Sequence, residues 1–246
     1  MMYPNWLIDI LRDPATNAKI SDVAQDQILS LVYPPTLTGE NLKMNQVYDR
    51  IAPLYHIAES IFGYLLAGIH MQRERKNIMS LLNLKPGIRL LEVSPGSGVF
   101  QPLLRETLGK EAQILSADLS MCMLQQCRKQ HGDLNIPLIQ ANAEHLPFAD
   151  ESFDALFHMG GINRFNHPDI ALKEFVRVTR KGGIIAWGDE YMSENFRHPI
   201  GRLLLPLLNP GVHKPIPSIP DHLHNVQRYE IYKGIAYLFI STKDQT

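Results

Sequence analysis

Residues 88–98 read Ile-Arg-Leu-Leu-Glu-Val-Ser-Pro-Gly-Ser-Gly, and this stretch decides the fold. Ile88 to Val93 is a short apolar run, typical of a strand that a parallel sheet buries on both faces. Gly96 and Gly98 permit a tight turn and a close approach of the backbone to a ligand. The helix expected after the turn, which ends near Leu108, presents free N–H groups at its first turn. The stretch therefore predicts a strand, a glycine-rich loop and a helix.

Beyond this stretch, strand and helix patterns alternate. We expect strands at 112–117, 136–140, 153–158 and 184–188, helices at 120–130 and 169–179, and a final pair of strands at 225–232 and 235–241. Ser120 is suited to cap the first of these helices and Pro168 to open the second. The alternation predicts an α/β fold, a doubly wound and mostly parallel seven-stranded sheet. The last two strands, joined at Lys233-Gly234, predict a C-terminal antiparallel hairpin.

Three segments lie outside this alternation. Residues 1–40 are expected to form a small separate N-terminal segment, and residues 41–246 the main domain. Within the main domain, residues 42–84 show apolar spacing typical of a helical cap, with Pro53 as a break. Residues 193–222 are rich in proline and predict a cover loop with a helical piece near 200–208.

Polar residues follow the expected strands at the edge where parallel strands end. Glu92 ends the first strand, where its carboxylate would face a cationic ligand group. Asp118 ends the second strand, about 20 residues after Gly98, which suits an acid that accepts hydrogen bonds from both ribose hydroxyls of an adenosine cofactor. After the third strand, the amide oxygen of Asn142 and the N–H of Ala143 suit an adenine ring. These residues predict an adenosine site at one sheet edge.

The ordered motifs resemble those of class I S-adenosylmethionine (SAM) methyltransferases, whose fold is Rossmann-like. The resemblance is strongest to the type 11 branch, which includes ubiquinone and menaquinone biosynthesis enzymes. It is carried by the segments 92–98, 118, 140–154 and 177–183, the last reading Arg-Val-Thr-Arg-Lys-Gly-Gly. Upstream, residues 48–55 resemble the family's N-terminal helix motif, which helps to close the SAM pocket. Ser94 stands where the family has the first loop glycine, and Asn142 where it usually has Asp.

The resemblance implies that the cofactor is SAM and the product S-adenosylhomocysteine. The implied cofactor-binding residues are Tyr48, Glu92, Ser94, Pro95, Gly96, Ser97, Gly98, Asp118, Leu119, Asn142, Ala143, Glu144 and Met159. Pro95 restricts the residue before it, so Ser94 is expected to have an ordinary, extended φ. The terminal hairpin also matches the antiparallel ending of this fold.

The acceptor is expected beside the fourth and fifth strands. His158 and His167 are candidate catalytic bases, and Asn163, Arg164, Glu190 and Tyr191 are candidate substrate residues. A base is needed only if the attacking atom carries a proton at the working pH. The apolar stretches 57–69 and 203–208 suit a small apolar or aromatic acceptor such as a quinone, lipid or phenol, or they are ordinary core and lid packing. Transfer to oxygen, nitrogen or carbon stays open.

Two other functions stay open. A SAM-binding protein without catalysis is consistent with the changes at Ser94 and Asn142. An NAD-dependent oxidoreductase would also use a glycine-rich loop and a downstream acid, but its Gly-x-Gly-x-x-Gly pattern needs glycine where this chain has Gln101. Residues 8–16 faintly resemble a small zinc-ribbon found before some bacterial methyltransferases. Residues 1–40 contain no cysteine, so the segment is either a metal-free relic or a chance match.

Composition and charge indicate which classes of partner and which cellular location to expect. The net charge of −1 gives no electrostatic footprint for nucleic acid. There is no secretory signal pattern, and the longest apolar stretch, 61–69, is too short for a bilayer span, so no stable membrane insertion is expected. Cys122 and Cys127 are poorly placed for a disulfide, which favours a cytoplasmic location. The scattered histidines lack metal-ligand spacing, so no metal is expected; the oligomeric state stays open.

Overall fold

An eight-stranded sheet forms the centre of the chain in the computed structural model, which describes residues 3–21, 23, 27–43, 46–47 and 68–245. The strand order is β1-β4-β3-β2-β5-β6-β8-β7. The strands are β1 (Leu29–Ser30), β2 (Arg89–Val93), β3 (Gln113–Asp118), β4 (Leu138–Gln140), β5 (Phe153–Met159), β6 (Thr179–Glu190), β7 (Leu223–Ile231) and β8 (Ala236–Lys243). All neighbours pair in parallel except β6 with β8 and β8 with β7. The predicted fold class and terminal hairpin are confirmed.

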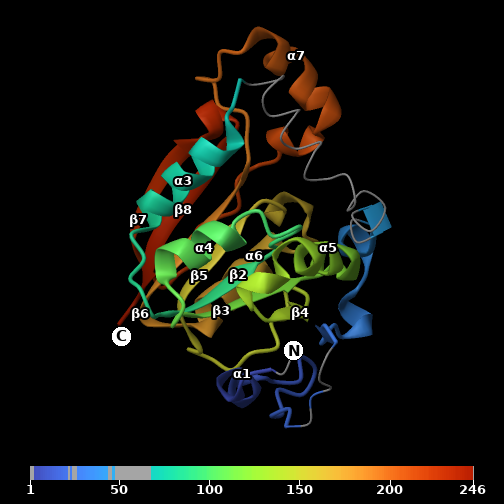
Figure 1. Ribbon diagram of the computed structural model, residues 1–246. Coiled ribbons are helices and arrows are strands. Elements are labelled where there is room, and N and C mark those ends of the chain that lie inside the picture. The colour runs from blue at the N-terminus through green and yellow to red at the C-terminus, as the bar shows by residue number, and fades with distance from the viewer. Residues whose placement is uncertain (1–2, 22, 24–26, 44–45, 48–67, 246) are drawn as a thin grey trace.

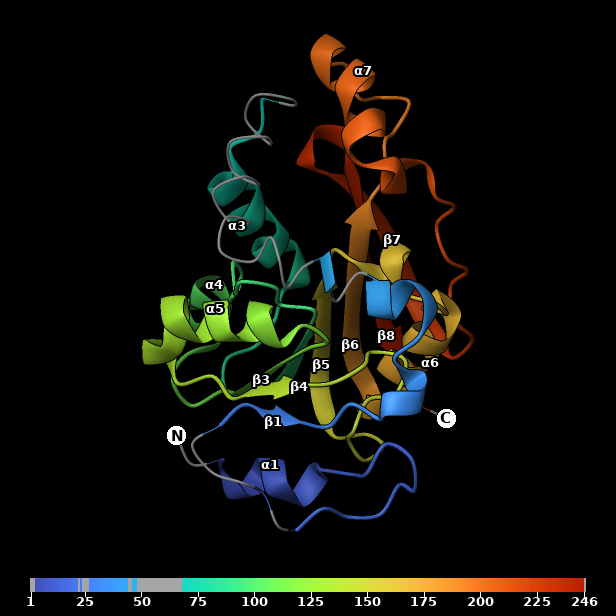
Figure 2. The ribbon, with the colours of Figure 1, turned by 90° about the vertical axis from the view of Figure 1, so that its right-hand side faces the viewer.

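Helices cover both faces of the sheet (Figures 1 and 2). They are α1 (Asn5–Ile10), α3 (Met71–Leu82), α4 (Gln101–Leu108), α5 (Met121–His131), α6 (Pro168–Val178) and α7 (Pro199–Leu208). One core cluster joins α3 and α4 to the sheet through residues such as Ile78, Leu104 and Phe157. A second cluster, on the other face, joins α6 and α1 through Phe175 and Leu7. The sheet is therefore buried on both faces, as its apolar strands predict.

The eighth strand corrects the predicted count of seven. It comes from the N-terminal segment, where β1 pairs with the edge strand β4 and the Leu31 N–H donates to the Gln140 carbonyl (2.8 Å). The Tyr3 hydroxyl donates to the Leu138 carbonyl (3.0 Å), and Leu7 is fully buried in the same cluster as the sheet. The described residues of 1–40 thus share the main core. A domain boundary at residue 40 stays a prediction.

Local signals account for most element ends. The Ser120 hydroxyl accepts a hydrogen bond from the Met123 N–H and caps α5, and Pro168 is the first residue of α6, as predicted. The helix α7 lies where the helical piece near 200–208 was expected. The chain continues as strand through 181–183, where a turn was expected, so β6 begins earlier, at Thr179. Most of the predicted helix around Pro53 lies outside the described residues.

The register of the sheet brings the predicted site residues to one edge. Val93 of β2 is level with Ala117 of β3 on one side and with His158 of β5 on the other. His158 is in turn level with Trp187 of β6. Because these strands are parallel, the loops that follow them emerge together at the carboxyl edge of the sheet. In an open α/β sheet, this edge is where ligands bind.

Candidate functional site

The loop between β2 and α4 has an unusual backbone, and it corrects one prediction. Ser94 has φ +57°, in the left-handed region, although an extended φ was expected. Its N–H donates to the Ala117 carbonyl (2.8 Å), so Ser94 is still hydrogen-bonded to β3 where the chain leaves β2. Serine therefore occupies a backbone conformation that favours glycine, the residue that the resembled family has there.

Gly98 is required in this loop for a steric reason. Its φ is +84°, and a Cβ at this position would lie 2.6 Å from the Cys127 sulfur of α5. The loop therefore packs directly against α5 at this point. By contrast, a Cβ at Gly96 would meet nothing within 4 Å, so the loop is open on its other side.

Asp118 joins the loop to the end of β3. Its Oδ2 accepts a hydrogen bond from the Gly96 N–H (2.9 Å), and its Oδ1 accepts one from the Ser120 N–H (2.9 Å). A carboxylate can accept about four hydrogen bonds, so both oxygens keep capacity for ribose hydroxyls. The carboxylate thus shapes the loop and stays competent to bind a sugar.

Glu92 lies beneath the loop in a closed environment. It is buried, and the Ser116 hydroxyl donates to its Oε2 (2.5 Å) while the Gln101 amide donates to that hydroxyl (2.9 Å). Burial raises the pKa of Glu92 to about 7, and the negative charge of Asp118 adds to the increase. A nearby cation would stabilise the ionised form and lower this pKa.

The segment after β4 is held by buried polar contacts. The Asn142 Oδ1 accepts from the Glu144 N–H (3.0 Å). The Glu144 carboxylate accepts from the Asn41 amide (2.9 Å) and from the His167 N–H (3.1 Å). Glu144 therefore links Asn41, the first residue of the predicted main domain, to the start of α6. These contacts hold the segment in place. Asn142 and Ala143 lie at the carboxyl edge, and the roles of Asn142, Ala143 and Glu144 as cofactor ligands stay predictions.

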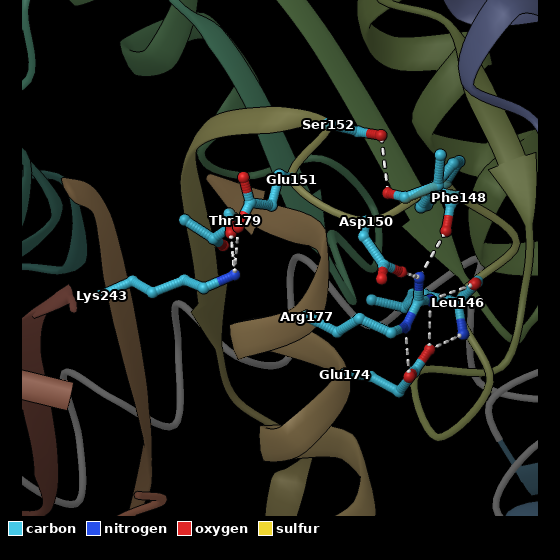
Figure 3. A network of polar contacts seen from close by, with 10 residues as sticks. Leu146, Phe148, Asp150, Glu151, Ser152, Glu174, Arg177, Thr179 and Lys243 are labelled. Atoms are coloured by element: carbon cyan, nitrogen blue, oxygen red, sulfur yellow. Dashed lines mark hydrogen bonds and ion pairs between the residues drawn. The ribbon is translucent and has the colours of Figure 1, made fainter. Parts of the chain in front are cut away.

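Arg177 of α6 holds residues 146–150, in the loop between β4 and β5, in place (Figure 3). Its guanidinium donates to the carbonyls of Leu146 (2.9 Å) and Phe148 (2.7 Å) and to the carboxylates of Glu174 (2.7 Å) and Asp150 (2.8 Å). Burial alone would lower the pKa of Arg177, but the hydrogen bonds to the two carboxylates outweigh it and raise the pKa. Arg177 therefore joins the 177–183 motif to the 140–154 motif, and we call these hydrogen bonds of Arg177 the clamp.

The acceptor side of the edge depends on Asp189, a residue that sequence reasoning missed. Asp189 is buried and accepts hydrogen bonds from the N–H groups of Gly161 (3.2 Å), Asn163 (2.6 Å) and Glu190 (2.7 Å). Burial raises its pKa, and the charge of Glu190 adds to the increase. Its position near the end of β6 is the sequence signal for a site residue, next to the predicted substrate residues Glu190 and Tyr191.

The predicted substrate residues lie together. The Asn163 amide donates to the Glu190 carbonyl (2.9 Å), and Arg164 lies 4.0 Å from the Glu190 carboxylate. Asn209, just beyond α7, donates to the Glu190 carboxylate and accepts from Arg164. Tyr191 lies under the Arg228 guanidinium, with 5.4 Å from its ring centroid to the guanidinium carbon. Charged groups of β6 and the 162–164 turn therefore meet the cover segment.

The two predicted catalytic histidines are placed differently: His158 does not have the placement of a base, whereas the role of His167 stays a prediction. His158 is fully buried between Phe165 and Phe175, and its Nδ1 is 3.1 Å from the Val93 carbonyl. Burial lowers its pKa to about 4, so it stays neutral at pH 7. His167 is exposed and uses its backbone N–H at the start of α6. The geometry is that of a packed core histidine and of a residue that precedes a helix.

The described residues fit an adenosine cofactor with a charged tail. A Cβ at Gly160 or Gly161, after β5, would meet nothing within 4 Å, as at Gly96 after the neighbouring β2. The buried Ser97 hydroxyl in the loop has no hydrogen-bond partner among the described residues. Leu119 and Met159 are half-buried at the same edge. Tyr48 lies outside the described residues. No cluster of three metal-binding side chains occurs in the part of the chain that the structure describes.

Comparison with known proteins shows a similarity to one family. Residues 91–187 match the type 11 family model described as a methyltransferase domain. The matched segment begins in β2 and ends in β6, so it contains the glycine-rich loop, Asp118 and the 140–154 motif. The predicted resemblance to this family is therefore confirmed.

Two curated relatives are similar to the chain in sequence, and one solved structure shares its fold. A ubiquinone/menaquinone biosynthesis C-methyltransferase of Haemophilus ducreyi is 32% identical over 141 residues, which are 56% of this chain and 53% of the relative. A demethylmenaquinone methyltransferase of Listeria welshimeri is 33% identical over 149 residues, 58% of this chain and 61% of the relative. A phosphoethanolamine N-methyltransferase 2 of Haemonchus contortus, solved with SAM, shares the fold at a TM-score of 0.61 and 13% identity, covering 87% of this chain and 62% of that one.

The chain spans 53% and 61% of the length of those two curated relatives.

Proposed function

We propose that the protein transfers a methyl group from SAM to a small apolar or aromatic acceptor. The observation that carries this proposal is the joined carboxyl edge, where Asp118 accepts from the Gly96 N–H within the family's cofactor loop. The same edge continues to Asn142 on one side and to the open space at Gly160 and Gly161 on the other. Together these features suit adenosine at one end of the edge and an acceptor at the other.

Each part of the cofactor has residues to hold it. Asp118 accepts from the ribose hydroxyls, and Asn142 and Ala143 hydrogen bond to the adenine. The 94–98 loop and the first turn of α4 receive the amino-acid tail, with Glu92 offsetting its positive charge. Tyr48 is proposed to close the pocket. Bound SAM supplies a methyl group on a sulfonium, and the neutral thioether is a good leaving group when the methyl is displaced.

The chain's own contribution is orientation and exclusion of water rather than proton transfer to a histidine. Alignment of a bound acceptor can lower a barrier by ~7–11 kcal/mol without a base. Because His158 is buried, we propose that the acceptor ionises by itself or transfers its proton to Glu190. Glu190 is 44% exposed and lies beside Arg164, so both can contact an acceptor that enters beside β6.

A quinone-type ring is the proposed acceptor class. Both curated relatives are named for quinone methylation, and the apolar cover helix α7 lies at the acceptor end of the edge. We also propose a cytoplasmic location, consistent with the two free cysteines among the described residues. No described helix is long and apolar enough to cross a bilayer.

The test is turnover with SAM and a reduced, demethylated naphthoquinone, followed by mass spectrometry. The expected product is the acceptor with one added CH₂, together with stoichiometric S-adenosylhomocysteine. SAM binding without product on quinols, phenols and lipids would favour the non-catalytic alternative. Hydride transfer to NAD would favour the oxidoreductase, although Gln101 is buried against Ser116 where that family needs glycine.

A further inference from the structure

The helix α7 presents an apolar stripe to the outside of the molecule. Ile200, Leu203 and Leu207 are 54%, 69% and 74% exposed, the highest values among the large hydrophobic residues described. Their spacing of three and four residues places them on one face of the helix. Single exposed leucines are ordinary, but three exposed apolar side chains along one face of a helix are typical of an interaction surface.

The exposure comes from the position of α7 in the fold. Figures 1 and 2 show α7 beyond the carboxyl edge of the sheet, away from α4, α5 and α6. Its start is fixed by polar contacts: the His198 Nδ1 accepts from the Gly201 N–H (3.1 Å), and Arg202 donates to the carbonyl of the buried Phe196 (2.8 Å). These contacts hold the helix without using the apolar stripe.

The segment that contains α7 carries an excess of positive charge. Residues 195–220 contain three basic residues, Arg197, Arg202 and Lys214, and no acidic residue, and the exposed Glu194 and Asp221 flank this segment. All three basic residues are exposed. A local excess of positive charge beside an apolar stripe is complementary to a surface that is anionic outside and apolar beneath.

We propose that α7 docks the protein on an anionic lipid bilayer, with the Ile200–Leu203–Leu207 stripe at the boundary between headgroups and acyl chains. The helix has 10 residues, about 15 Å of rise, so it is too short to span the bilayer and would lie in the interface. Arg197 and Arg202 contact lipid phosphates. This proposal concerns membrane attachment and does not depend on the proposed reaction.

Docking on α7 would turn the carboxyl edge of the sheet toward the bilayer. The helix is connected to that edge through Asn209, which contacts both Arg164 and Glu190. An acceptor dissolved in the membrane would then reach the site without crossing water. The geometry assigns α7 the role of a monotopic anchor at the mouth of the site.

Vesicle flotation with the full-length chain tests the proposal. We compare phosphatidylcholine vesicles with vesicles that also contain phosphatidylglycerol, at low and high salt. The expected result is binding to the anionic vesicles that weakens at high salt, falls at least tenfold in Leu203→Gln/Leu207→Gln and falls several-fold in Arg197→Gln. Leu81→Gln, at an exposed leucine of α3, is the matched control and should bind as the parent does.

Two outcomes would overturn the proposal. One is a parent protein that floats with neither type of vesicle, although its circular dichroism shows a folded chain. The other is a self-associated parent that sedimentation velocity shows to become monomeric in Leu203→Gln/Leu207→Gln while vesicle binding is unchanged, because α7 would then be an interface between copies. SAM binding is measured on the same variants and is expected to be unchanged, which separates failure of the anchor from failure of the proposed reaction.

Discussion

The Asp118 carboxylate accepts a hydrogen bond from the backbone N–H of Gly96, 22 positions earlier in the chain, at 2.9 Å. This contact joins the ends of two neighbouring strands, β2 and β3, through the loop that follows the first of them. The carboxylate that would hold the sugar also shapes the loop that would hold the amino-acid tail. The two halves of the cofactor site are therefore organised by one side chain.

Asp118 variants test whether this carboxylate contributes to SAM binding. Asp118→Ala removes both acceptors and is expected to weaken SAM binding by ~1–3 kcal/mol. Asp118→Asn keeps one carbonyl oxygen, so its loss should be smaller. Calorimetric titration measures both, with Asp133→Ala on the exposed 132–134 turn as the control. Equal SAM affinity in all three variants and the parent would contradict the pocket assignment.

Ser94 is expected to cost stability. A non-glycine residue with φ near +57° destabilises the folded state by roughly 1–2 kcal/mol. Glycine avoids this strain but has more conformational freedom in the unfolded chain, which offsets part of the gain in stability. Ser94→Gly should therefore raise the free energy of unfolding by about 1 kcal/mol in urea titrations. Ser94→Ala keeps the Cβ and should bring no gain. A destabilised glycine variant would show that the serine side chain, not the backbone, governs this position.

Glu92 should make stability depend on pH. Its pKa is about 7 in the folded protein and near 4.5 when unfolded, so the folded state binds more protons between these values. The free energy of unfolding contributed by Glu92 must then fall as pH rises from about 4.5 to 7. Glu92→Gln removes this slope, and its stability relative to the parent should increase with pH. Glu106→Gln, on the exposed side of α4, should leave the slope unchanged, and a parent slope that persists in Glu92→Gln would contradict the assignment.

Arg177 should be irreplaceable by lysine. Its guanidinium serves two carbonyls and two carboxylates at once, whereas an ammonium is a point charge without the planar fork. Arg177→Lys is expected to lower the free energy of unfolding by about 2–4 kcal/mol. Arg180→Lys, whose side chain is 52% exposed and paired with Asp154, is the matched control and should change it by less than about 1 kcal/mol. Similar losses in both would argue against the clamp.

Periodicity and end signals predict the elements well, because they depend on neighbouring residues. Ser120 and Pro168 mark helix starts through local chemistry, and the order of strands follows from right-handed crossovers. The strand Leu29–Ser30 was missed because two residues carry no periodicity, and only pairing with β4 defines it. The left-handed φ of Ser94 was also missed, since the hydrogen bond of its N–H to the Ala117 carbonyl is a contact of the fold, whereas the prediction used only the local preference of a residue before proline.

The sequence predicts the location of the proposed cofactor residues better than the arrangement of the acceptor side. Glu92 and Asp118 lie at the ends of β2 and β3, and Asn142 follows β4 by two residues, so topology alone brings them to one edge. The role of His158 depends on the direction of its side chain, which points between two rings of the core. Asp189 was overlooked because its three N–H donors lie on two separate segments that only the fold brings together.

Isothermal titration with SAM and S-adenosylhomocysteine, and with NADH as the comparison, tests whether the carboxyl edge of the sheet binds the methyl donor. We expect one saturable site for SAM and its product, weakened in Asp118→Ala, and no binding of NADH. A folded protein that gives no binding signal with either methyl compound would contradict this expectation.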